Sequence, residues 1–192
     1  DVVESVNVHD DIKIGLPTRD QYIENYKTTL KNLAKFGVKV VTYNFMPIFD
    51  WTRTDLFHPL EDGSNALYYE KSKIQDDYKE MAEYILKNLH GKTFPGWEPE
   101  RMAKLDELFE AYRPVTKEKL WENLQYFLEA IMPTCHETGI KMAIHQDDPP
   151  WDIFGIPRLL CDKESIGRFL HMVDDEYNCL CLCSGSLGAN MK

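Results

Sequence analysis

The sequence predicts an α/β fold built around a parallel sheet. Apolar stretches with strand character alternate with segments whose apolar residues recur at helical spacing, which is typical of βαβ units. Two later strands also end in residues that bind metals: 141–145 ends in a histidine and 179–183 ends in a cysteine. A helical segment separates these two strands, so we expect them to be parallel neighbours whose carboxyl ends meet at one edge of the sheet.

The first elements each carry a local signal. A short β-branched run predicts a strand over Val2–Val8. Thr18, followed three residues later by Gln21, predicts a capping box at the start of a helix that stops at Gly37. The next strand, Val38–Tyr43, is almost continuously apolar, as expected in a sheet that is covered on both faces.

The stretch 45–114 is too long to be one loop between a strand and a helix. It contains a loop rich in aromatic and charged residues over Phe45–Asn65, and two helical runs at about Lys71–Leu89 and Glu98–Tyr112. We interpret it as a helical insertion on the face where the strands end, because loops of this kind carry function more often than cores do.

The remainder returns to regular alternation. A long helix capped by Thr116 and ended by Gly139 leads into the histidine strand, and Asp162 caps one further helix before the cysteine strand. The inward face of that further helix is expected to be Ile166, Phe169, Leu170 and Val173. Right-handed crossovers would arrange the four strands as one contiguous parallel arc. Four strands do not close a barrel, so we expect residues 1–192 to be a single partial domain of a longer protein.

Composition narrows the class of protein. The chain has 192 residues, 43% hydrophobic and 28% charged, which is ordinary for a globular protein. A net charge of −10 argues against nucleic-acid binding, which needs a basic surface. No apolar run approaches the roughly 20 residues that span a bilayer. Five cysteines, an odd number, favour a reducing compartment, so we expect a cytoplasmic protein with Cys135 and Cys161 buried and inert.

His145 and Cys183 are the candidate metal ligands, because each ends a strand at the same expected edge. The alternatives are a core histidine bonded to the backbone and a small buried cysteine. A metal-bound histidine usually donates from its other ring nitrogen to a carboxylate or carbonyl. Asp147 or Asp148 could accept that hydrogen bond, although both residues would also suit a turn before two prolines.

The segment from Asn44 to Asp55 follows a strand and is the candidate substrate-binding loop. Arg53 offers a planar cationic fork that suits a carboxylate. Trp51 offers an apolar wall for a sugar-like chain, and Asn44 stands at the strand end. The alternative for Arg53 is a surface ion pair with Asp50 or Asp55.

His9 is a further pocket candidate, because it lies just past the end of the first predicted strand. Asp10 and Asp11 follow it directly, so a solvated turn is the alternative. We therefore expect His9 either to face the substrate or to lie at the surface.

Long runs of the sequence resemble mannonate dehydratases. The runs that carry the resemblance are Glu4–His9, Gly15–Asp20, Tyr43–Leu56, Ala143–Trp151 and Leu182–Asn190. Together they extend over essentially the whole chain, and their motifs are long and specific. Asn7 and Gln146 depart from the family's pattern, but neither is a candidate ligand.

The resemblance implies a xylose-isomerase-like (β/α)8 TIM barrel, of which this chain would supply about half, roughly strands 2–5, plus the insertion. It implies a hydro-lyase that converts D-mannonate to 2-keto-3-deoxy-D-gluconate and water in hexuronate (glucuronate) breakdown, using Mn2+ or Fe2+. It also implies that His145 and Cys183 bind this metal, while the other ligands and the main acid and base groups lie beyond Lys192. The catalytic residues are therefore unknown from this sequence. Softness alone would favour Zn2+ or Fe2+ at a thiolate and an imidazole, so Mn2+ is implied by the resemblance only.

Two other functions stay open. One is a metal-dependent sugar isomerase or epimerase on the same barrel, which would move a proton without losing water. The other is a non-catalytic domain in which a structural metal braces His145 and Cys183. For the dehydratase, the expected partner is a small sugar acid, D-mannonate, and a homodimer is the candidate assembly.

Overall fold

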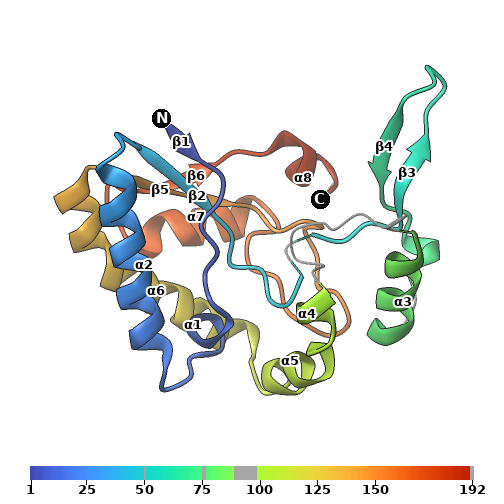
Figure 1. The fold of residues 1–192 in the computed structure, drawn as a ribbon, viewed down its shortest axis with the longest axis horizontal. Helices are drawn as coiled ribbons and strands as arrows, with labels where there is room; N and C mark the ends of the chain where they lie inside the picture. The colour runs from blue at the N-terminus through green and yellow to red at the C-terminus, as the bar shows by residue number, and fades with distance from the viewer. Residues whose placement is uncertain (50, 75–76, 89–98, 191–192) are drawn as a thin grey trace.

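The computed structural model describes residues 1–49, 51–74, 77–88 and 99–190. Within this part of the chain one parallel sheet consists of β1 (Val2–Val3), β2 (Val40–Tyr43), β5 (Lys141–His145) and β6 (Asn178–Cys181). The strands lie in the order β1-β2-β5-β6 (Figure 1). The predicted contiguous parallel arc is therefore confirmed, and the carboxyl ends of its strands share one edge of the sheet.

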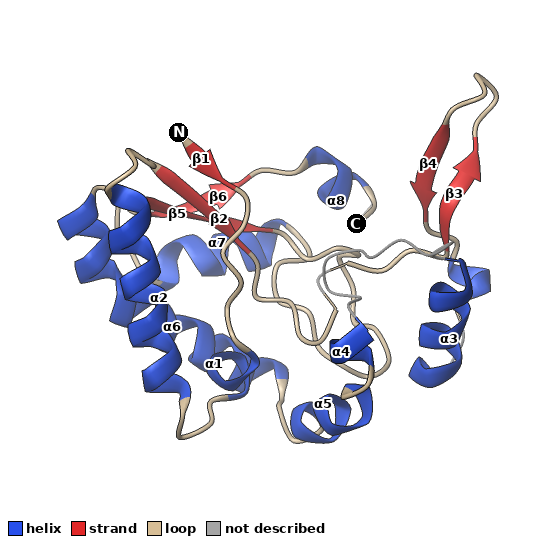
Figure 2. Ribbon diagram, in the orientation of Figure 1, coloured by secondary structure: helices blue, strands red, loops and turns tan. Residues whose placement is uncertain are grey.

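Helices α2 (Arg19–Ala34), α6 (Lys117–Thr138) and α7 (Lys163–Met172) lie on one side of this sheet (Figure 2). Phe127 of α6 is fully buried, and its ring meets those of Tyr26 on α2 at 5.0 Å and Tyr43 on β2 at 6.0 Å. Edge-to-face contacts of this kind add to the stabilisation from burial alone. This packed layer holds β2 and β5, whose ends carry the candidate site.

Two of the three predicted helix caps are present. Thr116 Oγ1 accepts from the backbone N–H of Lys119, and α6 ends at Gly139, whose φ of 69° suits a residue without a Cβ. Asp162 forms a capping box with Ser165 at the start of α7. The capping box predicted at Thr18 is wrong, because its backbone is already helical and its hydroxyl donates instead to the Asp11 carboxylate.

The N-terminal strand is shorter than predicted. Strand pairing ends after Val3, and a short helix, α1 (Asp10–Ile14), occupies the region just after the predicted strand. Val8 is nevertheless buried, so its apolar character reflects packing against the core rather than a sheet position. The run of valines therefore marked one buried position, Val8, and predicted too long a strand, since Val2 is 59% exposed and pairing ends after Val3.

The insertion contains the predicted helices and one element that was not predicted. Its elements are η1 (Lys71–Lys73), α3 (Tyr78–Asn88), α4 (Pro99–Met102) and α5 (Leu105–Tyr112), together with an antiparallel hairpin of β3 (Asp55–Pro59) and β4 (Asn65–Tyr68). Leu89 and Glu98, at the expected helix boundaries, lie outside the described residues. Figure 1 shows the hairpin and α3 to one side of the sheet and its helices.

The last elements differ from expectation in detail. Phe169 of α7 is fully buried, but Leu170 is 40% exposed, so its predicted inward position is wrong. Successive residues on a helix are about 100° apart, and the buried face of α7 is narrow. The cysteine strand ends at Cys181, and Cys183 is the N-cap residue of a further short helix, α8 (Ser184–Gly188).

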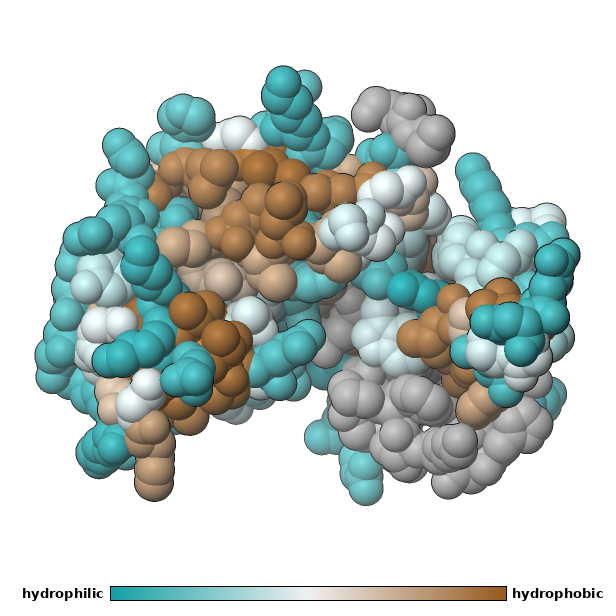
Figure 3. Space-filling view, turned by 90° about the horizontal axis from the view of Figure 1, so that it is seen from above, coloured by the Kyte–Doolittle hydropathy of each residue, from teal (hydrophilic) through white to brown (hydrophobic). Residues whose placement is uncertain are grey.

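The other side of the sheet is apolar and has exposed strand edges. Figure 3 views the molecule from above, opposite the layer of α2 and α6, and shows a broad apolar patch. Val2, on the edge strand β1, is 59% exposed, and Leu182, just after the edge strand β6, is 72% exposed. Among the described helices, none combines the length and the apolar character needed to cross a bilayer.

Candidate metal and substrate site

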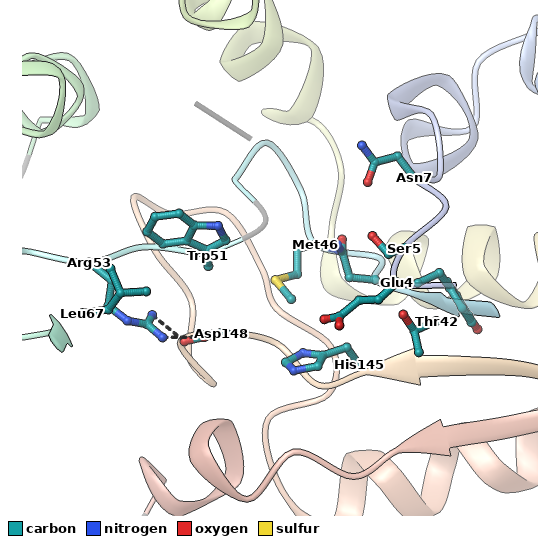
Figure 4. Close-up of a pocket in the computed structure, with 12 residues that line it drawn as sticks. Glu4, Ser5, Asn7, Thr42, Met46, Trp51, Arg53, Leu67, His145 and Asp148 are labelled. Carbon is teal, nitrogen blue, oxygen red and sulfur yellow. Dashed lines mark hydrogen bonds and ion pairs between the residues drawn. The ribbon is translucent and has the colours of Figure 1, made fainter. Parts of the chain in front are cut away.

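A cavity of about 600 Å³ opens at the carboxyl end of the sheet. Its lining comes from the segments that follow β1, β2 and β5, with Leu67 of the hairpin at one side (Figure 4). Of the residues predicted to bind substrate or metal, His145, Asn44, Trp51 and Arg53 all contribute to it. The strand-end reasoning therefore located this pocket, because parallel strands bring their carboxyl ends together.

His145 ends β5 and is half-buried. Its Nδ1 lies 2.6 Å from the backbone carbonyl oxygen of Gln146. A carbonyl can only accept, so Nδ1 carries the hydrogen, and in the neutral ring the lone pair is on Nε2. This is the tautomer of a histidine that binds a metal through Nε2 while a carbonyl orients the ring.

Neither aspartate takes the place expected of it beside His145. Asp147 is buried, and its Oδ2 accepts from the backbone N–H groups of Leu159 at 3.0 Å and Leu160 at 2.6 Å. Asp148 instead accepts from Arg53. The prediction that one of them supports the histidine is corrected, since the adjacent backbone carbonyl already accepts from Nδ1.

Cys183 lies beside His145, two residues beyond the end of the neighbouring strand β6, as the N-cap residue of α8. His145 is paired in register with Cys181, two residues before Cys183. The pKa of the Cys183 thiol is lowered to about 7, first by hydrogen bonds from the hydroxyl and backbone N–H of Ser186 and then by the His145 imidazole. With this pKa, about half of the thiol is present near neutral pH as the thiolate that binds metals.

Two other thiols, those of Cys135 and Cys161, contrast with that of Cys183. Cys135 and Cys161 are buried and free, as predicted. Burial raises the pKa of each thiol to about 12. They therefore stay protonated near neutral pH and are poor ligands.

The donors present fit part of a metal site. His145 supplies an imidazole lone pair and Cys183 supplies a thiolate, and both are ordinary ligands of divalent transition metals. Among the described residues, no group of three or more His, Cys, Asp and Glu side chains is gathered closely enough to hold a metal. A site normally takes three or four protein ligands, so these two would form one portion of the full set.

Arg53 faces the cavity and forms a bidentate ion pair with Asp148. Its Nη1 and Nη2 donate to the two carboxylate oxygens at 2.8 and 2.7 Å, and Nη1 also donates to the Thr52 carbonyl. Asp55, one of the predicted alternative partners, instead accepts from the backbone N–H of Phe57. Asp50, the other alternative, lies outside the described residues. The guanidinium is therefore held in one orientation at the cavity wall.

The other substrate-binding candidates are placed differently from one another. Trp51 lines the cavity, with the Arg53 guanidinium 6.0 Å from its ring centre. Asn44 lines it as well, and its side chain accepts from the backbone N–H of Met46. His9 does not line this cavity: it is exposed, caps α1 and stacks on Tyr22 with ring centres 3.5 Å apart.

Sequence reasoning missed two residues of this region. Gln146 is fully buried, and its Oε1 accepts from the backbone N–H of Cys183 at 2.9 Å, so it links the ends of β5 and β6. Glu4 extends into the cavity from the segment after β1. The signal for both was the one that identified His145, namely a polar residue directly after a strand.

Comparison with known proteins agrees with this geometry. The family model described as D-mannonate dehydratase (UxuA) matches residues 1–192. A mannonate dehydratase of Endomicrobium trichonymphae is 59% identical over 193 residues, covering 100% of this chain and 53% of the relative. Mannonate dehydratase 1 of Bacillus licheniformis is 60% identical over 191 residues, covering 99% of this chain and 52% of the relative.

A solved structure is also similar. The crystal structure of mannonate dehydratase from Streptococcus suis serotype 2 superposes with a TM-score of 0.81 at 45% identity, covering 98% of this chain and 48% of that one. The chain spans about half the length of the curated relatives that it matches. Because the family model matches all 192 residues of this chain and the relatives are near 60% identical to it, the chain belongs to the D-mannonate dehydratase family.

Proposed function

We propose that the whole protein, of which this chain is a part, is a hydro-lyase that removes water from D-mannonate to give 2-keto-3-deoxy-D-gluconate. One observation carries the proposal: in a chain of this family, the His145 imidazole lies close enough to the Cys183 thiol to lower its pKa, at the end of the sheet that forms the cavity, and its Nδ1 is already bonded to a carbonyl. Parallel α/β sheets bind their ligands at this end. A small sugar acid suits a cavity of this size with an arginine in its wall.

A (β/α)8 barrel is the proposed complete fold. The sheet supports this proposal because it has the layout of an arc: helices lie on one side, the opposite side is apolar, and both edge strands are open. The two-fold greater length of the relatives leaves room for the remaining strands. In a closed barrel, the apolar side would become the packed interior.

The proposed metal is Mn2+ or Fe2+, with His145 and Cys183 as two of its ligands. A divalent ion there would stabilise negative charge that develops on the substrate's oxygens as a proton leaves the carbon beside the carboxylate. Gln146 supports both ligands: its carbonyl orients the imidazole, and its side chain holds the Cys183 backbone. The other ligands and the acid and base groups would come from the remainder of the protein.

Arg53 is the proposed partner of the substrate's carboxylate. A guanidinium has five N–H donors, and three of them are used by Asp148 and Thr52. Within the described residues, Nε and one N–H of Nη2 have no protein acceptor, and these two donors lie on one edge of the planar group. Asp148 can therefore hold one edge while the other edge binds a carboxylate, with Trp51 as the neighbouring apolar wall.

The test is a product assay of the full-length protein loaded with Mn2+ or with Fe2+. Incubation with D-mannonate should give a 2-keto-3-deoxy acid, detectable as its periodate–thiobarbiturate adduct and by a mass lower by one water. A sugar isomerase or epimerase would instead give a product of unchanged mass from an aldose or ketose. A protein with tightly held zinc and no product from any of these substrates would indicate a structural metal. A homodimer and a cytoplasmic location stay predictions.

A further inference from the structure

We propose that Glu4 determines substrate specificity in this cavity: its carboxylate accepts hydrogen bonds from hydroxyl groups of the sugar acid and repels substrates that carry a second carboxylate. The inference rests on the proposed function and adds a recognition residue to it. Three properties of Glu4 support it, namely its anchored backbone, the lack of a hydrogen-bond or ion-pair partner for its side chain among the described residues, and its place relative to Arg53.

The backbone around Glu4 is fixed against β2. Val3 pairs in register with Val41, and the Val3 carbonyl also accepts from Thr42 Oγ1 at 3.4 Å. Beyond Glu4, the backbone N–H of Val6 donates to the Thr42 carbonyl at 3.2 Å. Glu4 is therefore anchored on both sides at the carboxyl end of the sheet, as a residue that recognises a ligand should be.

The carboxylate of Glu4 points into the cavity. Figure 4 shows it directed between Met46 and His145. Two carboxylates line this cavity in the described structure, and the other, Asp148, is neutralised by Arg53. Glu4 is exposed, and its side chain forms no hydrogen bond or ion pair with any described residue.

A carboxylate that no described residue pairs with is a strong hydrogen-bond acceptor for hydroxyl groups. Its two oxygens can each accept more than one hydrogen bond, and bonds to a charged acceptor are stronger than neutral ones. A polyhydroxy chain offers adjacent O–H donors at the spacing of a carboxylate's oxygens. A second carboxylate at the same place would instead meet a like charge that no described cation offsets.

Charge also orients the substrate. In Figure 4, Arg53 and Glu4 extend into the cavity from opposite sides, with His145 between them. A substrate with one carboxylate would place it toward Arg53 and its hydroxyl groups toward Glu4. An aldaric acid, which has a carboxylate at each end, would be forced to bring one of them toward Glu4.

The experiment uses the full-length metal-loaded protein and two probes of the same configuration. D-mannonate is assayed as substrate, and D-mannarate, its dicarboxylate counterpart, is assayed as a competitive inhibitor. Glu4→Gln should lower kcat/KM for D-mannonate by about tenfold to 100-fold, as expected for loss of hydrogen bonds to a charged acceptor. It should also lower the inhibition constant of D-mannarate, relative to the KM of D-mannonate, by about tenfold or more, because the like charge is gone.

Two further variants and a metal measurement make the outcome decisive. Glu4→Asp keeps the charge, so it should retain the discrimination against D-mannarate, and it serves as the readout if Glu4→Gln does not fold. Glu61→Gln makes the same substitution at an exposed hairpin residue outside the cavity. It should change neither kcat/KM for D-mannonate nor the inhibition constant of D-mannarate. Metal content should be equal in all of these proteins.

The possible failures are distinguishable. A wild-type protein that does not dehydrate D-mannonate contradicts the proposed function. An active wild type whose Glu4→Gln variant keeps both constants contradicts the role of Glu4 alone. Loss of metal in that variant, or a fall in kcat with unchanged KM and unchanged inhibition, would assign Glu4 to metal binding or proton transfer and overturn the inference.

Discussion

Replacing Arg53 with lysine should test the carboxylate-binding role most directly. Lysine keeps the positive charge but has a single nitrogen with three donors. It cannot hold both oxygens of Asp148, at the 2.8 and 2.7 Å now observed, and both oxygens of a substrate carboxylate at once. At least one charge-assisted hydrogen bond should therefore be lost in the complex with substrate.

The size of the effect follows from that lost bond. A hydrogen bond to a charged group contributes about 1.5–3 kcal/mol. This free energy corresponds to a fall in kcat/KM for D-mannonate of roughly tenfold to 150-fold. Metal content should stay the same, because Arg53 contacts Asp148 and Thr52 rather than His145 or Cys183.

The assay measures kcat/KM and bound metal on the same preparation of the full-length protein. Arg113→Lys is the matched control, since Arg113 is largely exposed and pairs with Glu110 within its own segment. An unchanged kcat/KM in Arg53→Lys would return Arg53 to a purely structural ion pair with Asp148. A parallel loss of metal would mean that the pair supports the shape of the site instead.

Three other outcomes follow from the structure. His145→Ala and Cys183→Ala should each lower the metal bound per protein in elemental analysis of the full-length protein, whereas His171→Ala, on the exposed side of α7, should not. In metal-free protein, alkylation of Cys183 by iodoacetamide should rise as the pH passes through about 7, because its pKa is lowered to that value, while Cys135, with a pKa raised to about 12, stays unreactive. An alkylation rate of Cys183 that does not change with pH would contradict this lowered pKa. Because the pKa of Cys183 in the folded protein lies below its usual value, the ionised thiol stabilises the fold at alkaline pH, and this stabilisation is lost as the pH falls through about 7. Phe127→Ala should lower the free energy of unfolding by about 3–5 kcal/mol in urea denaturation, because it empties a fully buried ring position between α6 and β2, and a loss below about 1 kcal/mol would refute that packing.

Features set by nearby residues were predictable from the sequence. The caps at Thr116 and Asp162 depend on contacts three residues away, and both are present. The hairpin of the insertion also had a local signal, since Asp62-Gly63 is a typical hairpin-turn pair and Gly63 has φ 82°. Its strands were missed because their polar and aromatic residues do not alternate clearly.

Thr18 marks the limit of such local signals. Its spacing to Gln21 matched a capping box, yet its hydroxyl binds Asp11, seven residues earlier. A local pattern states which hydrogen bonds a residue can make, and folding brings competing acceptors within reach. The choice between them was a property of the folded chain.

The sequence by itself determined the α/β class, the order of the parallel strands, and the placement of His145 at a strand end with Cys183 shortly after the neighbouring strand. These features depend on the spacing of apolar residues along the sequence, and that spacing can be read within the few residues that form one strand or helix. The tertiary structure decided the partners: Arg53 with Asp148 across 95 residues, the carbonyl of Gln146 rather than an aspartate for His145, and Glu4 beside the histidine. The physical reason is that a polar side chain bonds the acceptor or donor that packing places within about 3 Å, and sequence distance carries no information about that separation.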